Sequence, residues 1–263
     1  MAAMLEIKNL GKRFPARTGR EPPPWIIQDM SFSVGAGELL TIVGPSGAGK
    51  STLLNIVAQI DVASAGEVTF DGERIASAEQ KALHPGLNRR IGYVTQDDNL
   101  LPWRTTIDNV LFPLEVQGTL DDASRARASE LIAAVGLSSF ERYYPHELSG
   151  GMRKRAALIR TLVYDPPMIL MDEPFAAVDA QTRTQLQQDL LRLWSLKRKT
   201  IIFVTHDITE AIALGDRALV LTQRPARIAA EHPIPIPRPR NVKDIFTLQG
   251  FPAIYERLRK DVQ

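Results

Sequence analysis

The chain has 263 residues, 32 basic and 30 acidic side chains, four histidines and no cysteine. This length accommodates one large domain or two small ones, and a formal charge of +2 argues against a protein built mainly to coat nucleic acid. The absence of cysteine excludes disulfides, thiolate catalysis and cysteine-ligated zinc or iron–sulfur sites. The sequence lacks a stretch of about 20 apolar residues, and Glu6, Lys8 and Asn9 stand where a signal peptide needs an apolar core. We therefore expect neither membrane insertion nor export by that route.

Apolar, β-branched runs alternate with helical patterns, which is typical of an α/β domain with a mostly parallel sheet. Alternation of apolar and polar residues predicts antiparallel or edge strands at Met4–Lys8 and Glu67–Phe70. Continuous apolar runs predict buried strands at Leu39–Val43, Ile91–Thr95, Met168–Met171, Thr200–Val204 and Ala218–Leu221. Helical patterns occupy Lys50–Ala58, Asp122–Val135, Gly150–Tyr164 and Ala180–Leu196.

Two proline-rich stretches punctuate this pattern. Pro15 to Pro24 reads as a polar insertion after the first strand. From His232 to Pro239, proline alternates with Ile and Arg, so we expect this stretch to lie outside any sheet, with extended backbone. We interpret the second stretch as the exit from the main domain and predict a short helix at Asp244–Lys260.

The segment Gly44–Ser51 reads GPSGAGKS and fits the pattern G-x-x-x-x-G-K-[S/T] between a predicted strand and a predicted helix. Its glycines allow backbone N–H groups to face a phosphate, and the helix N-terminus adds partial positive charge. Lys50 can neutralise β- and γ-phosphate charge, and the Ser51 hydroxyl can ligate Mg²⁺. The predicted nucleotide-binding residues here are Gly44, Pro45, Ser46, Gly47, Ala48, Gly49, Lys50, Ser51 and Thr52.

Two acids, Asp172 and Glu173, follow the apolar run Met168–Met171. They stand at the carboxyl end of a predicted strand, where open α/β sheets bind ligands. Alone, such a pair is more often a solvated strand end. Beside a phosphate loop, Asp172 suits Mg²⁺ binding and Glu173 suits activation of an attacking water.

The segment Leu148-Ser149-Gly150-Gly151-Met152 resembles the signature loop of the ATP-binding-cassette (ABC) superfamily, and it lies shortly before the Asp–Glu pair, as in that family. The resemblance covers about residues 4–225. It implies an α/β P-loop cassette with a mostly parallel core sheet, an antiparallel β edge and a helical signature subdomain at about 97–165. The implied division is an ATPase domain at 4–230 and a C-terminal extension at 231–263.

The same resemblance assigns further site residues. Phe14 matches the aromatic that stacks on adenine, Gln96 the Q-loop glutamine, Asp179 the D-loop aspartate and His206 the switch histidine. It implies that two copies pair head-to-tail, with the P-loop of one and the signature Ser149, Gly150 and Gly151 of the other enclosing each ATP. The expected catalytic residues are Glu173, His206, Gln96 and Lys50, and the expected Mg²⁺ ligands are Ser51, Gln96 and Asp172.

Two positions depart from the family pattern. Met152 replaces the usual signature glutamine, and the segment Ala176–Asp179 lacks the usual D-loop serine. The basic run Arg153-Lys154-Arg155 favours a solvated helix face over a nucleic-acid site. We expect structural roles for the remaining histidines, His84, His146 and His232, which show no metal-ligand spacing.

The signature, the phrase Leu100–Thr105 and the segment Phe175–Arg183 look most like cassettes of the nitrate/sulfonate/taurine importer group. This resemblance implies a peripheral ATPase on the cytoplasmic face of the inner membrane of a bacterium. Its partners are then a second copy, a permease that docks near Gln96–Thr106 and, indirectly, a periplasmic binding protein, with no nucleic acid. Trp103 is either core or a partner anchor. An exporter, a lipid transporter and a non-transport ABC ATPase remain alternatives.

Overall fold

The computed structural model describes residues 3–15, 23–79 and 89–262. The chain forms two compact units by its internal contacts. We call Met1–Asn88 with Arg198–Gln263 the P-loop unit and Arg89–Lys197 the helical unit. Most of the predicted insertion Pro15–Pro24, and His84, lie outside the described residues.

One sheet of the P-loop unit is antiparallel, with the strand order β2-β1-β4-β5. Its strands are β1 (Ala3–Lys12), β2 (Ile27–Gly35), β4 (Ala65–Phe70) and β5 (Glu73–Ser77). The two predicted alternating strands lie within β1 and β4, where Leu5 pairs with Phe70 and Ile7 with Val68. These four side chains are fully or almost fully buried, as the alternation predicted. The sequence analysis did not identify β2 or β5.

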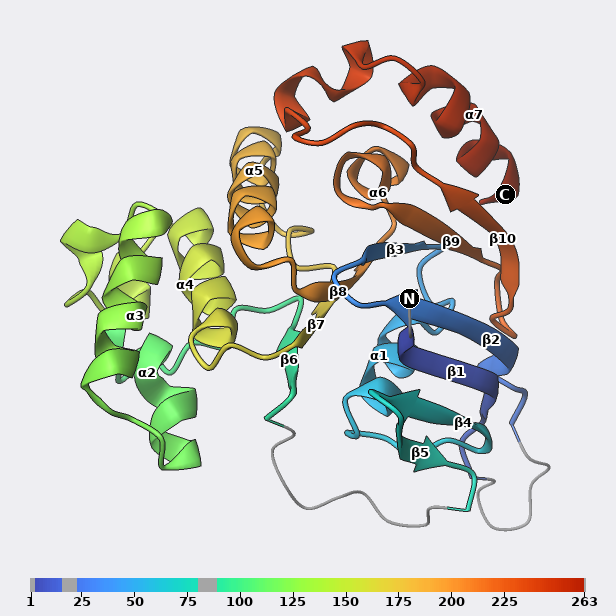
Figure 1. Ribbon diagram of the computed structural model, residues 1–263, viewed down its shortest axis with the longest axis horizontal. Helices are drawn as coiled ribbons and strands as arrows, with labels where there is room; N and C mark the ends of the chain where they lie inside the picture. The colour runs from blue at the N-terminus through green and yellow to red at the C-terminus, as the bar shows by residue number, and fades with distance from the viewer. Residues whose placement is uncertain (1–2, 16–22, 80–88, 263) are drawn as a thin grey trace. The chain divides into compact units, whose positions relative to one another are not determined.

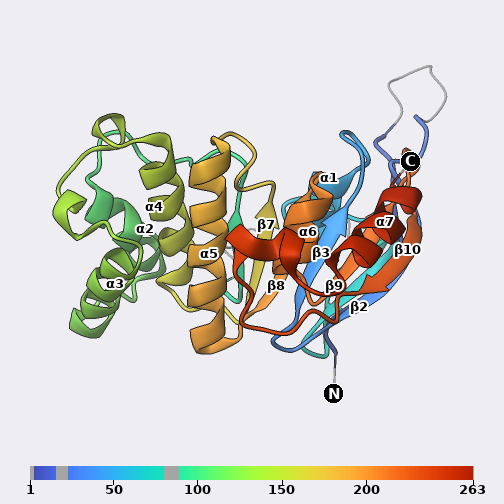
Figure 2. The same cartoon turned by 90° about the horizontal axis from the view of Figure 1, so that it is seen from above.

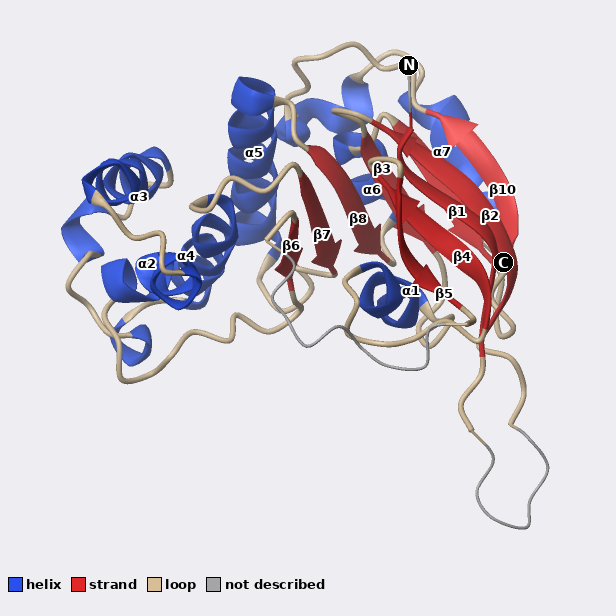
Figure 3. Ribbon diagram, turned by 60° about the horizontal axis from the view of Figure 1, so that its bottom comes forward, coloured by secondary structure: helices blue, strands red, loops and turns tan. Residues whose placement is uncertain are grey.

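The other strands of the P-loop unit surround β3 (Leu39–Val43), which runs parallel to both β8 (Thr200–Thr205) and β9 (Arg217–Leu221). Every residue of β3 is buried. The α1 helix (Lys50–Val57) covers one face of β3 and α6 (Ile208–Leu214) covers the other (Figures 1 and 3). Cover on both faces explains why β3 and β8 read as continuous apolar runs. The predictions of these three parallel strands and of α1 are confirmed.

The β10 strand (Ile228–Pro233) pairs antiparallel with β9 at the edge of this sheet. The prediction that the stretch from His232 lies outside the sheet was wrong at its first two residues, because His232 pairs with Ala218 and Pro233 with Arg217. An edge strand tolerates proline, since one row of its N–H groups needs no partner strand. The proline-rich stretch thus begins inside the sheet and leaves it after Pro233.

The C-terminal segment forms two short elements instead of the single predicted helix: a 3₁₀ helix at Val242–Thr247 and α7 at Phe251–Asp261. Gly250, with φ 91°, separates them. The α7 helix buries Phe251, Ile254 and Leu258, and contacts α6 and β10 (Figure 2). The extension is therefore part of the P-loop unit and packs onto α6 and β10.

The helical unit contains the parallel strands β6 (Ile91–Val94) and β7 (Met168–Asp172). Its helices are α2 (Thr106–Gln117), α3 (Asp122–Ala134), α4 (Gly150–Leu162) and α5 (Ala180–Lys197), with 3₁₀ turns at Ser138–Phe140 and Pro145–Glu147. The α4 helix packs against the other three helices and β6. The predictions of α3, α4 and α5 are confirmed, whereas α2 was not predicted. Across the described residues, every helix is too short or too polar to cross a membrane.

Candidate functional site

The phosphate loop connects β3 to α1 through two glycines in the left-handed region, Gly47 (φ 77°) and Gly49 (φ 100°). A Cβ atom on Gly49 would lie 2.9 Å from Cγ2 of Ile26, so backbone strain and lack of space both require glycine there. A Cβ on Gly47 would meet nothing within 4 Å. The loop therefore needs Gly49 for both its backbone conformation and its lack of space, and Gly47 for its backbone conformation alone.

Lys50 is the first residue of α1, and it is only 5% exposed. Its Nζ donates hydrogen bonds to the carbonyl oxygens of Gly44 (2.8 Å) and Pro45 (3.0 Å). The loop thus wraps its own ammonium group, at a helix N-terminus whose first N–H groups suit an anion. Ser51 follows with an exposed side chain and Thr52 with a half-buried one.

His206 lies between the end of β8 and the start of α6, and its side chain is exposed. Its neighbours are held on both sides. The Asp207 N–H donates to Thr205 Oγ1 (3.0 Å), and the Asp207 carboxylate accepts from the N–H groups of Thr209 and Glu210 at the start of α6. A strand end and a helix cap therefore fix the backbone at His206.

Phe14 follows β1 and is 48% exposed. The Nζ of Lys12 lies 5.1 Å from its ring centroid, while the same ammonium pairs with Asp61 Oδ1 at 2.6 Å. An exposed aromatic ring with a cation beside it suits stacking on a planar base.

In the helical unit, Asp172 ends β7 and Glu173 follows it. The hydroxyl of Tyr93 in β6 donates to Asp172 Oδ2 at 3.5 Å. Burial, with the Asp172 charge second, raises the pKa of Tyr93 well above its usual range, so this phenol stays a donor. Glu173 has φ 43°, a left-handed conformation that costs a non-glycine residue free energy and is concentrated at functional sites.

Gln96 follows β6, and α4 holds its loop. The Lys154 ammonium donates to the Gln96 carbonyl, Arg153 Nε donates to Asp98 Oδ2 (3.0 Å), and Arg160 donates to the Asp98 carbonyl (2.7 Å). Lys154 is only 9% exposed, and burial lowers its pKa.

The expectation of a solvated face at Arg153-Lys154-Arg155 was therefore wrong. Two of these side chains bind the Gln96 loop, and Arg155 pairs with Asp189 of α5 at 3.0 Å. Charge density alone did not reveal these partners, which lie 34 to 58 positions away in the sequence.

The signature residues begin α4. Ser149 caps the helix by accepting a hydrogen bond from the Met152 N–H, while Ser149 and Gly150 are exposed. A Cβ on Gly151 would lie 2.6 Å from Cγ2 of Thr182, so this glycine allows α4 to approach α5. The Thr182 N–H donates to Asp179 Oδ1 (3.0 Å). Hydrogen bonds from the Thr182 side chain first, and from its backbone second, lower the Asp179 pKa.

The loop before α2 exposes 71% of Trp103, which therefore is not core. Fully buried Asn109 shapes this loop: its amide donates to the carbonyls of Leu101 and Arg104, and its oxygen accepts from the Leu101 N–H (2.7 Å). Sequence reasoning missed Asn109, although the spacing of Thr105 and Asp108 was a usable helix-start signal just before it.

The structure distributes the predicted residues over two units. The P-loop unit carries Phe14, His206 and the loop from Gly44 to Thr52, and the helical unit carries the rest, namely Gln96, Ser149, Gly150, Gly151, Asp172, Glu173 and Asp179. Tyr93 and Lys154 join the helical set as residues that the sequence analysis did not assign to the site.

The donors predicted for Mg²⁺ suit that ion, because Ser51, Gln96 and Asp172 all supply hard oxygen ligands. Elsewhere in the described part of the chain, His, Cys, Asp and Glu side chains form no group of three that could hold a metal. His146 stacks on Tyr144, and His232 Nε2 lies 2.7 Å from Asp261 Oδ2.

The model of the ABC transporter family matches residues 27–176. An uncharacterized ABC transporter ATP-binding protein of Methanocaldococcus jannaschii is 42% identical over 262 residues, covering 100% of this chain and 94% of that protein. The aliphatic sulfonates import ATP-binding protein of Bacillus cereus is 38% identical (90% and 89% covered), and the taurine import ATP-binding protein of Burkholderia pseudomallei is 42% identical (81% and 78% covered).

Solved structures agree. A bacterial ABC transporter cassette, described as dimeric, matches with TM-score 0.75 and 33% identity, over 88% of this chain and 99% of that one. A dimeric post-hydrolysis state of an ATP-binding cassette, bound to ADP and Pi, matches with TM-score 0.74, 32% identity and the same coverage. The predicted family and fold class are confirmed. The chain belongs to the ABC transporter family and is one of its ATPase cassettes.

Proposed function

We propose that this chain is the ATP-hydrolysing subunit of a bacterial ABC importer for sulfonate-, taurine- or nitrate-like solutes, working as a head-to-tail dimer beneath a separate permease. The observation that carries the proposal is the roughly 40% identity, over four fifths or more of the chain, to proteins named as sulfonate and taurine import cassettes. The intact phosphate loop and the acids Asp172 and Glu173 support it.

In the proposed binding step, the backbone N–H groups at the start of α1 receive the phosphates of ATP, and Lys50 exchanges its carbonyl partners for β- and γ-phosphate oxygens. The two carbonyl contacts of Lys50 support this step, because they hold the ammonium inside the phosphate loop. Phe14 stacks on adenine. Ser51, Gln96 and Asp172 would hold Mg²⁺, which neutralises phosphate charge when it is bound.

In the proposed hydrolytic step, the Glu173 carboxylate orients a water for in-line attack on the γ-phosphate and accepts its proton. His206 contacts the γ-phosphate and stabilises the charge that develops there. The left-handed backbone at Glu173 supports this role, because such strain persists only where the surrounding structure fixes it.

Pairing of two copies supplies the remaining groups. Ser149, Gly150 and Gly151 of one copy contact the ATP held by the P-loop of the other, and Asp179 couples the two sites. Exposure of Ser149 and Gly150 at the N-terminus of α4 supports this assignment. The dimeric state of the similar solved cassettes gives it a precedent.

The permease is proposed to dock on residues 96–106. Trp103 is the anchor, because a largely exposed tryptophan on a loop braced by buried Asn109 presents a rigid aromatic surface. Binding of solute to a periplasmic partner then acts on the cassette only through the permease. The location follows: the cytoplasmic face of the inner membrane.

The test uses the chain reconstituted with its permease and binding protein in vesicles. ATPase activity and solute uptake should both rise with a sulfonate, taurine or nitrate, and Trp103→Ala should abolish the coupling while leaving ATP binding intact. Trp194, buried in α5, is not a suitable control, so exposed Phe246→Ala on the C-terminal extension serves instead. Stimulation by none of the three solute classes overturns the substrate assignment, and solute efflux driven by ATP overturns the importer assignment.

A further inference from the structure

Arg240 is a buried cation on the C-terminal extension. Its side chain is only 3% exposed, and its guanidinium donates to a ring of backbone carbonyl oxygens. Nη1 reaches the oxygens of Ile212 (2.9 Å) and Gly215 (2.6 Å), while Nη2 reaches those of Ile234 (3.0 Å) and Ile236 (2.9 Å). Burial, with the Arg238 charge second, lowers the pKa of Arg240 to about 10. A buried guanidinium is costly, so its fork of donors needs this set of acceptors.

The carbonyl oxygens of Ile212 and Gly215 lie at the C-terminal end of α6, so Arg240 caps that end of the helix. That helix has only seven residues, Ile208–Leu214, and so few turns do not persist without external support. The last carbonyls of a helix lack intrahelical partners, and a cation there is favoured by the helix dipole. The Asp207 cap holds one end of α6, and Arg240 holds the other.

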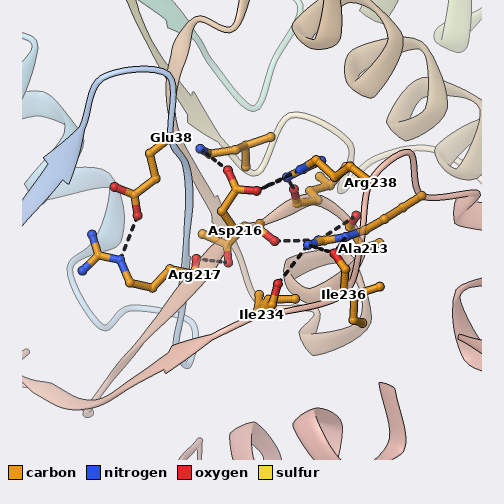
Figure 4. Close-up of polar contacts among 12 residues, drawn as sticks. Glu38, Ala213, Asp216, Arg217, Ile234, Ile236 and Arg238 are labelled. Carbon is orange, nitrogen blue, oxygen red and sulfur yellow. Dashed lines mark hydrogen bonds and ion pairs between the residues drawn. The ribbon is translucent and has the colours of Figure 1, made fainter. Parts of the chain in front are cut away.

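A second arginine of the extension binds beside it. Arg238 donates through Nε to Asp216 Oδ1 (2.8 Å) and through Nη2 to the Leu214 carbonyl (2.5 Å). Asp216 in turn accepts from the Leu39 N–H through Oδ2 (2.9 Å), at the start of the strand that leads into the phosphate loop. Figure 4 shows Asp216 beside Arg238, with the carbonyl-bearing residues Ala213, Ile234 and Ile236 gathered at the same place.

We infer that Arg240 is a positioning residue for ATP hydrolysis: by closing the C-terminal end of α6 from the extension, it fixes the helix whose N-terminal boundary carries His206. Arg240 then acts on hydrolysis from the extension through its contacts with the end of α6. This inference rests on the proposed role of His206 at the γ-phosphate. The phosphate loop itself keeps its own contacts at Lys50, so loss of Arg240 should change turnover and leave nucleotide binding in place.

The test is a double-mutant cycle in the full chain between Arg240→Met and His206→Ala. Arg240→Met should lower kcat at saturating ATP and Mg²⁺ by about 10- to 100-fold, the scale of a misplaced catalytic group. KM and the binding of a fluorescent ATP analogue should change less than about twofold, because a change in either requires the loss of a contact made in the ground state. With His206→Ala already present, Arg240→Met should lower kcat no further.

Arg240→Lys keeps the charge but lacks the fork, so it should restore part of kcat. If Arg240→Met does not fold, as shown by the loss of cooperative thermal unfolding, Arg240→Lys replaces it in the double-mutant cycle with His206→Ala. The matched control is Arg259→Gln, an exposed arginine of α7 paired with Glu256, which should behave as wild type.

The outcomes distinguish a failure of the positioning role of Arg240 from a failure of the proposed function. Independent, multiplicative losses in the double variant, or unchanged kcat in both folded Arg240 variants, overturn the positioning role and leave the proposed function standing. Wild-type turnover in His206→Ala overturns the role of His206 in the proposed function and this inference with it.

Discussion

The ammonium group of Lys154, in the second turn of α4, donates a hydrogen bond to the backbone carbonyl of Gln96, just beyond β6. The same helix begins at the signature residues Ser149 and Gly150. The α4 helix thus carries the signature at its N-terminus and binds the loop at Gln96 through the Lys154 side chain. Under the proposed function, these two motifs serve different ATP molecules of the dimer, so α4 is placed to couple them.

We expect Lys154→Met to lower ATP turnover about tenfold while nucleotide binding to the phosphate loop is retained. The substitution keeps the apolar stem but removes the donor to Gln96, whose lost partner should also cost about 1–3 kcal/mol of unfolding free energy. Steady-state ATPase assays and denaturant unfolding measure the two effects. Lys197→Met removes an exposed lysine paired with Asp165 and is the matched control. Equal turnover in both variants would contradict a role for Lys154 at the Q-loop.

Local patterns in the sequence were sufficient for the parallel strands, for β1 and β4 of the antiparallel sheet and for the phosphate loop, but not for β2 and β5. A strand such as β3 needs only continuous apolar residues, and Gly47 needs only a position where φ is positive. The missed elements depend on other signals. The α2 helix contains Pro113, which argues against a helix interior, and only its Thr105 cap marks its start. Pro233 ends a strand that exists because β9 offers an edge.

Site residues divide in the same way. Motif spacing was enough to predict site roles for Lys50, Asp172 and Glu173, because each belongs to a short local pattern. In the sequence, Lys154 and Arg240 look like ordinary surface cations. The Lys154 ammonium binds a backbone carbonyl 58 positions away, and the Arg240 guanidinium binds carbonyls at the end of α6. Carbonyl acceptors leave no trace in side-chain composition. Only the fold reveals such partners.

Tyr93→Phe tests the metal site. The Tyr93 hydroxyl donates to Asp172, and partners that orient a metal-ligating carboxylate tune metal affinity. We expect the Mg²⁺ concentration for half-maximal ATPase to rise up to about tenfold, the low end for such contacts, because 3.5 Å is a long hydrogen bond. Titrating ATPase against Mg²⁺ at fixed ATP gives the value. A Tyr164→Phe variant, which changes another half-buried tyrosine two residues after the end of α4, should titrate as wild type.

The raised pKa of Tyr93 also predicts a dependence of stability on pH. Above pH 10.0, the ordinary pKa of tyrosine, the phenol of the folded chain keeps its proton whereas that of the unfolded chain releases it, so the folded state binds more protons. The stability contributed by Tyr93 is therefore complete below pH 10 and declines as pH rises beyond it. Tyr93→Phe should flatten this decline in urea unfolding from pH 8 to about 11. An identical alkaline slope in wild type and variant would show that Tyr93 is not buried as described.

Glu173 offers a test of strain against chemistry. Glycine adopts φ 43° freely, so Glu173→Gly should be more stable than Glu173→Ala by about 1 kcal/mol. Both should lack turnover, as should Glu173→Gln, which keeps the shape of the side chain and should still bind ATP. Thermal unfolding and ATPase assays separate the two effects. If Glu173→Gln hydrolyses ATP near the wild-type rate, the assignment of the water-activating base is wrong.

The contact between Gly151 and Thr182 permits a designed rescue. A Cβ on Gly151 would lie 2.6 Å from Cγ2 of Thr182, well inside van der Waals contact, so Gly151→Ala should force α4 from α5 and destabilise the chain by about 1–3 kcal/mol. Turnover should fall as well, because the exposed signature residues Ser149 and Gly150 move with the start of α4.

Thr182→Ser removes only the methyl group that would clash and keeps the backbone N–H that binds Asp179. The double variant should therefore recover most of the stability and turnover that Gly151→Ala loses. The control is Gly150→Ala, whose Cβ would come no closer than 3.9 Å to Arg153 and which should gain nothing from Thr182→Ser. Purely additive effects of Gly151→Ala and Thr182→Ser would mean that the two helices do not meet at this point.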